Sequence, residues 1–99
     1  QALARARQTN RSVLVIFSTD WCGYCKLLKR DLLPAGEVRR ALGGYVLVEL
    51  DAEKDGRSLA SRMNVSGFPT LIVFDSSGKE RRRMSGCPQS AGDLAAWLQ

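Results

Sequence analysis

The sequence contains no histidine, and this absence limits the chemistry that the chain can perform. Without an imidazole there is no histidine general acid or base, no cysteine–histidine dyad and no histidine metal ligand. Only three cysteines are present. Because a zinc site usually takes four ligands drawn from cysteine and histidine, we expect no bound metal.

Long apolar runs are also missing. No stretch approaches the roughly 18 consecutive apolar residues of a membrane-spanning helix, so we expect no span in this chain. The opening QALARARQTNR is charged and lacks the apolar core of a signal peptide. Since the chain begins at Gln1 and not at methionine, we expect that upstream residues have been removed.

Extreme composition is absent as well. The 99 residues are 44% hydrophobic and 25% charged, which is typical of one globular domain, here residues 1–99, that folds without disulfide staples. The formal net charge is +5, and the basic residues are not interleaved with aromatic ones. We therefore predict a solvated basic surface and no nucleic-acid binding.

Residue patterning predicts four strands, three of them apolar. Continuous β-branched and aromatic runs at Ser12–Ser18, Tyr45–Asp51 and Thr70–Asp75 are typical of buried strands. The polar segment Lys79–Met84 follows a turn and suits an edge strand. There Arg81 to Arg83 would hinder pairing with another chain, and a docking patch for an acidic partner is the alternative.

Helical spacing of apolar residues predicts the remaining elements. A short helix opens the chain, and a second follows the first strand with Lys26, Lys29 and Arg30 on its solvent side. A helix capped by Asp55 and a last helix capped by Ser90 complete the order α-β-α-β-α-β-β-α. The strand–helix–strand units favour parallel pairing of the first two strands.

The stretch STDWCGYCK places Cys22 and Cys25 three residues apart, directly after a predicted strand. Metal ligation, a structural disulfide and a reactive pair are the three roles to compare. Metal ligation lacks ligands, because only Cys87 remains and there is no histidine. A structural bridge across so short a loop would add little stability, since it removes little entropy from the unfolded chain.

A reactive pair fits the local sequence best. The helix is predicted to begin near Cys22, where unpaired backbone N–H groups and the positive end of the helix dipole stabilise a thiolate. Cysteines in such positions have pKa values of roughly 3.5–7.5, and Lys26 adds a modest positive charge one turn later. Cys25 is close enough to attack a mixed disulfide formed at Cys22. We therefore predict a redox-active pair.

Two motifs resemble the thioredoxin superfamily. WCGYCK, Trp21 to Lys26, is similar to the WCGxCK motif of the superfamily, and VSGFPT, Val65 to Thr70, is similar to its cis-proline loop. The resemblance covers nearly the whole chain. A helix takes the place of the first thioredoxin strand, and in this the chain looks most like exported bacterial thioredoxin-like domains such as the C-terminal domain of DsbD.

The resemblance implies an α/β thioredoxin fold, in which helices flank a central four-stranded mixed sheet. It also implies a thiol–disulfide oxidoreductase that needs no cofactor, with an exposed Cys22 as nucleophile and a buried Cys25 as resolving thiol. The Phe68–Pro69 bond is expected to be cis, which leaves the Phe68 backbone free to pair with an extended substrate peptide.

Three residues around the cysteines are expected to complete the substrate-binding rim: Trp21, Gly23 and Tyr24. Trp21 would flank the site and pack against it, and Tyr24 would shape the rim. The dipeptide between the cysteines resembles that of the bacterial periplasmic disulfide isomerase and differs from the Gly-Pro of cytosolic thioredoxins.

The sequence departs from the superfamily at a buried charged pair. Ile16 stands where thioredoxins carry a buried aspartate, and Leu47 stands where they carry its lysine partner. Losing both partners avoids an unpaired buried charge. The resolving thiol then needs another proton acceptor, either water or Glu49, which shares a strand face with Leu47. The alternative for Glu49 is an ordinary polar residue near a strand end.

The missing carboxylate also affects the reduction potential. Its loss favours the Cys22 thiolate, and a stabilised thiolate makes the couple more oxidising, so we predict a potential above that of thioredoxin. A reductase or electron relay is our primary hypothesis, with protein thiols and disulfides as partners, among them a membrane or soluble redox protein. A disulfide isomerase or oxidase, or a redox-independent binding module or holdase, is the alternative.

Cys87 is expected in a loop beside the cis-proline, where a third thiol could form a mixed disulfide or a dimer. The alternative is an incidental, partly buried cysteine. Otherwise we expect a monomer. By its resemblance the chain is expected in the bacterial periplasm or another extracytoplasmic compartment, with the cytoplasm as the alternative.

Overall fold

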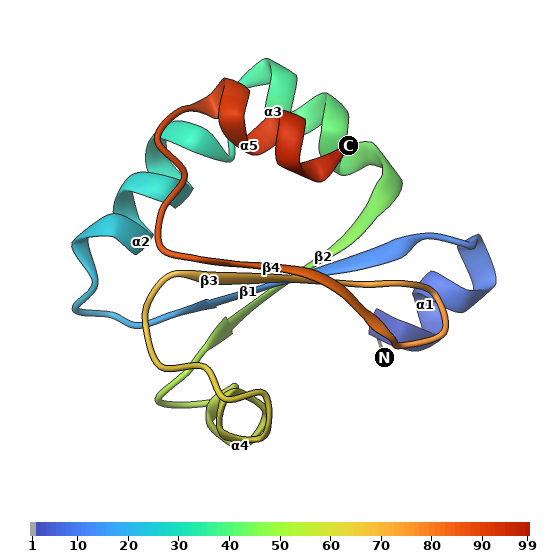
Figure 1. Cartoon of the computed structure of the whole chain (residues 1–99), viewed down its shortest axis with the longest axis horizontal. Helices are drawn as coiled ribbons and strands as arrows, with labels where there is room; N and C mark the ends of the chain where they lie inside the picture. The colour runs from blue at the N-terminus through green and yellow to red at the C-terminus, as the bar shows by residue number, and fades with distance from the viewer. Residues whose placement is uncertain (1) are drawn as a thin grey trace.

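A computed structural model describes residues 2–99, with side chains described from residue 4 onwards; Gln1 lies outside the described residues. Helices lie on both faces of a mixed β-sheet (Figure 1). The elements follow one another along the chain as α1 (Ala2–Thr9), β1 (Ser12–Ser18), α2 (Gly23–Leu27), the π-helical turn η1 (Leu28–Leu32), α3 (Gly36–Ala41), the 3₁₀ turn η2 (Leu42–Gly44), β2 (Tyr45–Asp51), α4 (Arg57–Arg62), β3 (Thr70–Phe74), β4 (Glu80–Ser85) and α5 (Ala91–Leu98).

The four strands form one sheet in the order β2-β1-β3-β4. β1 and β2 are parallel, as predicted, with Ile16 opposite Glu49. A parallel pair needs a long crossover, and α2, η1 and α3 provide it. The β1–β3 and β3–β4 pairs are antiparallel. The expectation of a four-stranded mixed sheet flanked by helices, with a helix before the first strand, is confirmed.

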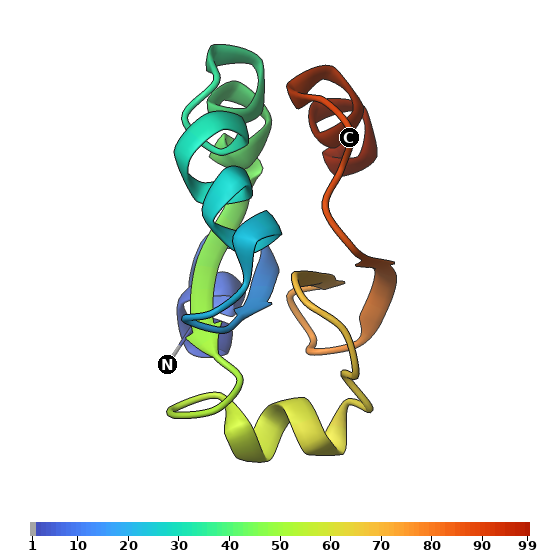
Figure 2. The ribbon, with the colours of Figure 1, turned by 90° about the vertical axis from the view of Figure 1, so that its left-hand side faces the viewer.

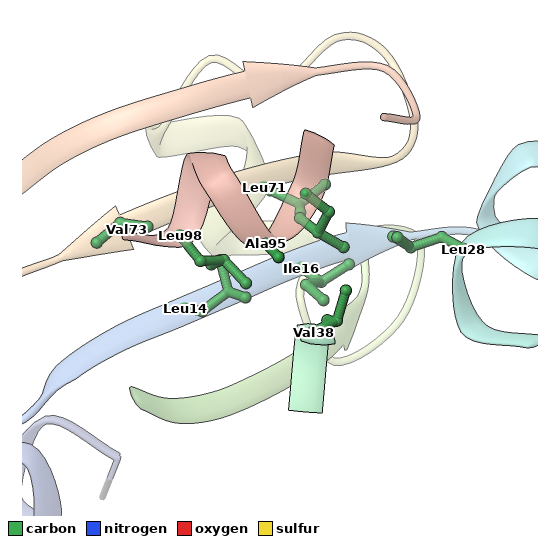
Figure 3. Packing of buried hydrophobic residues seen from close by; sticks show 9 residues of the cluster. Leu14, Ile16, Leu28, Val38, Leu71, Val73, Ala95 and Leu98 are labelled. Atoms are coloured by element: carbon green, nitrogen blue, oxygen red, sulfur yellow. The ribbon is translucent and has the colours of Figure 1, made fainter. Parts of the chain in front are cut away.

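Side chains alternate along the central strand β1, so it supports a hydrophobic cluster on each face of the sheet. Leu14 and Ile16 face the layer of η1, α3 and α5, whereas Val13, Val15 and Phe17 face α1 and α4 (Figure 2). Figure 3 shows the first cluster, whose buried members are Leu14, Ile16, Leu28, Val38, Leu71, Val73, Leu94, Ala95 and Leu98.

β2 differs from the prediction of a buried strand. It lies at one edge of the sheet, and only Val46 is buried among its seven residues. Leu47 is 39% exposed. An edge strand has a neighbour on one side only, so the helices that cross the sheet leave part of it uncovered. The apolar run therefore predicted a strand correctly, but the prediction that this strand is buried is wrong.

Two helix boundaries also differ from the predictions. The helix after β1 changes to π geometry over η1, where the Leu33 N–H donates to the Leu28 carbonyl. Asp55 does not cap α4: it accepts a hydrogen bond from the Asp51 N–H, and Gly56 is the N-cap. Ser90 caps α5 as predicted, because its hydroxyl accepts from the Asp93 N–H at 3.1 Å.

The C-terminal end of α5 is held by β4 and β2. Arg82 donates to the Trp97 carbonyl, and its guanidinium lies 5.7 Å from the centroid of the Trp97 ring. The Tyr45 hydroxyl donates to the Leu98 carbonyl. These bonds satisfy carbonyls that a helix end leaves without partners.

The neighbouring arginines of β4 are also engaged within the fold. Arg83 donates to the Met63 carbonyl at 2.8 Å and pairs with Glu80. Arg81 lies on the surface, 3.9 Å from a carboxylate oxygen of Asp75. The run predicted as edge protection or a docking patch therefore consists mainly of residues that support the fold. Within residues 2–99 no helix is long and apolar enough to cross a membrane.

Candidate active site

Cys22 occupies the N-cap of α2, where the chain leaves β1 and turns into the helix. Its backbone is extended, with φ −83° and ψ 113°, and its Sγ accepts a hydrogen bond from the Cys25 N–H at 3.1 Å. The Cys22 N–H donates to the Thr19 carbonyl at 3.4 Å. Since N-cap side chains accept from free helix N–H groups, the sulfur lies where a negative charge is favoured. The predicted position at the helix start is confirmed.

Cys22 and Cys25 are joined in a disulfide, with their Cα atoms 5.3 Å apart. Cys25 is 2% exposed and Cys22 is 5% exposed. The expectation of an exposed Cys22 is therefore wrong for the disulfide form. The Cys22 sulfur is bonded to the Cys25 sulfur and accepts the Cys25 N–H. Both contacts direct the Cys22 side chain toward the start of the helix.

Two aromatic side chains form an exposed rim beside the disulfide. Trp21 and Tyr24 are each 66% exposed. The Trp21 ring stands edge-on to Phe68 with 6.0 Å between centroids, and its Nε1–H donates to Glu53 Oε2 at 3.1 Å. The sequence analysis missed Glu53, because no motif connects the loop after β2 to the cysteine pair.

The Phe68–Pro69 peptide bond is cis, and Pro69 is buried. The Pro69 carbonyl accepts from the Gly86 N–H at 2.8 Å. Gly86 has a φ of +98°, a conformation that favours glycine, and it directs the following loop toward the site. Gly23 lies on the outside of the helix start, where an added Cβ would meet nothing within 4 Å.

A surface pocket of about 430 Å³ lies against the rim. It brings Cys87, as predicted for its loop, beside residues of the cysteine motif and the proline loop. Cys87 is partly buried, and this burial raises the pKa of its thiol. The pocket is lined by Tyr24, Leu27, Phe68, Gly86, Cys87, Pro88 and Gln89.

Lys29 is predicted on the solvent side of its helix, but its ammonium lies at the end of β1. Its Nζ donates to Ser18 Oγ at 3.3 Å. The wider turn of η1 and the long lysine stem permit this reach across the helix. Lys26 remains exposed. Lys29 was not foreseen as a neighbour of the site, because its contact with Ser18 depends on how η1 packs against the end of β1.

Ile16 and Leu47 differ in burial. Ile16 is fully buried, whereas Leu47 lies partly exposed on the edge strand. Glu49 is exposed opposite Ile16, and among the described residues no hydrogen bond joins it to either cysteine. Glu49 does share a cavity of about 450 Å³ with Lys29. The lining residues are Lys29, Leu33, Pro34, Arg39, Leu42, Leu47 and Glu49.

The loop between β1 and Cys22 carries two further polar side chains. Asp20 pairs with Lys54 at 2.8 Å, and this hydrogen bond and the lysine charge lower the pKa of the Asp20 carboxyl. The Thr19 hydroxyl is buried and has no hydrogen-bond partner within the described part of the chain. Across residues 2–99, no group of three or more histidine, cysteine, aspartate or glutamate side chains is placed to hold a metal ion.

Comparison with known proteins gives a consistent family. The model of the family described as Thioredoxin-like domain matches residues 1–99. The thiol:disulfide interchange protein DsbD of Cronobacter sakazakii is 39% identical over 83 residues, which cover 81% of this chain and 14% of that protein. DsbD 2 of Pseudomonas aeruginosa is 35% identical over 100 residues, covering 96% of this chain and 17% of the relative. The chain thus spans less than a fifth of these curated relatives.

Solved structures support the same assignment. A thioredoxin from Thermus thermophilus superposes with a TM-score of 0.86 at 28% identity, covering 98% of this chain and 78% of that one. The match of the family model to the whole sequence agrees with the sheet order and with a Cys-x-x-Cys disulfide at a helix start. The chain belongs to the thioredoxin-like domain family.

Proposed function

We propose that this chain is an enzyme, a thiol–disulfide oxidoreductase that exchanges its Cys22–Cys25 disulfide or dithiol with protein partners. The observation that carries this proposal is the position of Cys22 at the N-cap of α2, within disulfide distance of Cys25. The names of the relatives, which are thiol:disulfide interchange proteins, support the same reaction class.

The reaction proceeds in two exchange steps. The Cys22 thiolate attacks a substrate disulfide, so that one substrate sulfur leaves as a thiolate and a mixed disulfide forms. The Cys25 thiol then loses its proton, and its thiolate attacks the Cys22 sulfur. The second substrate thiolate leaves and takes up a proton. Two electrons pass to the substrate, and the Cys22–Cys25 disulfide is regenerated.

The direction of electron flow that we propose is reduction or electron relay, with a potential above that of thioredoxin. Fully buried Ile16 supports the higher potential, because an apolar residue in place of a carboxylate removes a negative charge that would disfavour the thiolate. A disulfide isomerase or oxidase shares the same residues and a still higher potential. A redox-independent binding module or holdase is the other candidate, and it would not need Cys22.

The substrate-binding surface that we propose is the rim formed by Trp21, Gly23 and Tyr24 together with Phe68 and Pro69. The exposed aromatic rings and the adjoining pocket give an apolar surface beside the buried disulfide. An extended peptide that carries a cysteine would lie along the proline loop, with its sulfur directed at Cys22.

Three accessory residues remain proposals. Lys26 adds positive charge near the pair, and Glu49, or water, takes the proton from Cys25 through the cavity on that side of the sheet. Cys87 lines the pocket on the other side of the rim, where it would contact a bound substrate. Its raised pKa makes Cys87 a weaker nucleophile at neutral pH than an ordinary cysteine.

We further propose a monomer that acts outside the bacterial cytoplasm on protein thiols and disulfides, including a membrane or soluble redox partner. The DsbD relatives support this location and partner class. Neither nucleic acid nor an added cofactor is required by the exchange chemistry.

A trapping experiment tests the proposed reaction. Reduced Cys25→Ser should accumulate a mixed disulfide with a disulfide-bonded protein such as insulin, because the resolving thiol is gone. Cys22→Ser should form no such adduct at this site. Alkylation of Cys22 with iodoacetamide should abolish insulin reduction. If the alkylated protein still suppresses aggregation of an unfolded client while wild-type protein reduces nothing, the holdase is correct and the enzyme is not.

A further inference from the structure

Lys29 makes a contact that its position in the sequence does not explain. Its residue is exposed, yet its ammonium turns toward the sheet and donates to the buried Ser18 hydroxyl at 3.3 Å. Ser18 is the last residue of β1, and the chain reaches Cys22 four residues later. The charge of Lys29 therefore lies between the helical segment and the strand that carries the active-site loop.

Lys29 lies on the same helical face as the resolving cysteine. Residues three and four apart on a helix are neighbours, and Leu28 and Lys29 follow Cys25 at these spacings. Cys25 and Leu28 are both buried, and Leu28 belongs to the cluster on this face of the sheet. Figure 3 shows Leu28 reaching toward the end of β1, close to Ile16. The Lys29 ammonium thus reaches Ser18 from a position one helical turn after Cys25.

No carboxylate neutralises this ammonium at short range. The ion pairs found among residues 2–99 join Arg30 to Asp31, Lys54 to Asp20, Arg81 to Asp75 and Arg83 to Glu80, and Lys29 belongs to none of them. The hydrogen bond and charge of Lys54 are the main causes of the lowered pKa of Asp20, and the Lys29 charge makes the smallest contribution to it.

We propose that Lys29 is a positioning residue of the resolving step: held on Ser18, its positive charge favours the thiolate of Cys25. This inference rests on the proposed exchange reaction. Ile16 and Leu47 are apolar and cannot assist ionisation of the resolving thiol. We assign this role to Lys29 of η1. An adjacent cation lowers the pKa of a thiol, because it stabilises the charged form.

The step itself balances without any further reactant. In the mixed disulfide, Cys25 releases its proton to water or Glu49 and attacks the Cys22 sulfur. The bond from Cys22 to the substrate breaks, the bond from Cys22 to Cys25 forms, and the substrate leaves as a thiolate. Lys29 keeps its proton throughout and changes only the fraction of Cys25 that is ionised.

Several other charged or titratable groups surround the cysteine pair. Asp20 and Lys54 neutralise each other, and Glu53 is held by Trp21. Lys26 is exposed on α2, and Glu49 lines the same cavity as Lys29. From the elements packed around the pair these groups are Asp20, Tyr24, Lys26, Lys29, Glu49, Asp51, Glu53, Lys54 and Cys87.

The test is a single-turnover reaction of the fully reduced protein with oxidised glutathione. Samples are quenched with acid at millisecond intervals, and mass spectrometry measures the glutathione adduct and the internal disulfide. Lys29→Met should slow conversion of adduct to disulfide about threefold to sixfold at pH 7, as expected for one partly screened charge a helical turn away. Formation of the adduct should not change.

The pH profile separates this role from a structural one. Removing the charge disfavours the Cys25 thiolate, so the deficit of Lys29→Met should disappear at high pH, where the thiolate forms in both proteins. Lys29→Gln is a second neutral variant if Lys29→Met folds poorly, and Lys29→Arg should restore the rate. Arg30→Met is the matched control, because it removes an adjacent exposed charge that is paired with Asp31.

Each outcome decides between the alternatives. Equal resolving rates in wild type and both neutral variants at every pH would overturn the role of Lys29. A resolving rate that is lowered by the same factor at every pH would also overturn this role, because it indicates a distorted site. If wild-type protein forms neither adduct nor disulfide, the exchange reaction itself fails, and this result is distinct from both.

Discussion

Single atoms at the helix start account for the chemistry of the cysteine pair. The Cys22 sulfur accepts the Cys25 N–H at 3.1 Å, and a thiolate at the same position would accept this bond more strongly because it is charged. The neutral disulfide gains less from it. The reduced form is therefore favoured by the backbone alone, before any side-chain charge contributes.

Thr19, beside the cysteines, offers a test of packing at the scale of one residue. Its buried hydroxyl has no partner within the described residues, and such an orphaned group costs about 1–3 kcal/mol. Thr19→Val keeps the shape and removes the hydroxyl, so we expect it to raise the free energy of unfolding of the oxidised protein by about 1 kcal/mol or more. Urea denaturation followed by circular dichroism measures the change.

Thr70→Val is the matched control for this prediction. Thr70 is also buried, but its hydroxyl donates to the Gly67 carbonyl at 2.6 Å. Thr70→Val leaves that carbonyl without its hydrogen-bond donor and should lower the free energy of unfolding by about 1–2 kcal/mol. If Thr19→Val destabilises the protein as much as Thr70→Val does, the Thr19 hydroxyl has a partner after all.

Among single residues, the sequence was sufficient for those that local motifs contain. Cys22 and Cys25 and the proline loop follow from short patterns, and Ser90 follows from capping chemistry. Lys29 and Glu53 could not be found in this way, because their contacts depend on how η1 and the loop after β2 meet the active-site loop. Those contacts are tertiary, and no local pattern encodes them.

At the scale of elements, the same distinction between local patterns and tertiary contacts explains which predictions were wrong. Apolar runs predicted β1, β2 and β3, because β-branched residues favour strands wherever the strand lies, and the turn before a polar segment predicted β4. The edge position of β2 depends on its neighbours, so its exposed Leu47 was not foreseen. The π-helical geometry of η1 also escaped prediction, since the apolar spacing at Leu28 and Leu32 does not distinguish it from an α-helix.

The junction between β2 and α4 gives a prediction for elements. A Cβ added at Gly56 would lie 2.7 Å from Leu50 Cβ and 3.0 Å from the Asp51 carbonyl oxygen. Gly56→Ala should therefore lower the free energy of unfolding by about 1–3 kcal/mol, because β2 and α4 must move apart. Thermal unfolding followed by circular dichroism detects the loss.

Gly43 supplies the control at the other end of β2. Nothing lies within 4 Å of an added Cβ there, so Gly43→Ala should be neutral or stabilising by up to about 1 kcal/mol. Equal melting temperatures for the Gly56 and Gly43 variants would show that the two elements do not approach as closely as described.

At the scale of the whole molecule, the fold separates two environments around one disulfide. The cluster above the sheet, with Ile16 and Leu28, closes the inner side of the pair, whereas the rim of Trp21 and Tyr24 faces solvent. Among the described residues no carboxylate is buried on the inner side, and η1 contributes the Lys29 cation at the end of β1. Both features favour the reduced form of the couple.

The reduction potential of the Cys22–Cys25 couple tests this account most directly. The reduced and oxidised proteins would be equilibrated against glutathione buffers, and then against dithiothreitol buffers, with the thiols counted by alkylation and mass spectrometry. We predict a value above about −270 mV, the level of thioredoxin, because the thiolate form is stabilised. A value at or below about −270 mV would contradict the stabilised thiolate, and the absence of any reversible couple would contradict the oxidoreductase itself.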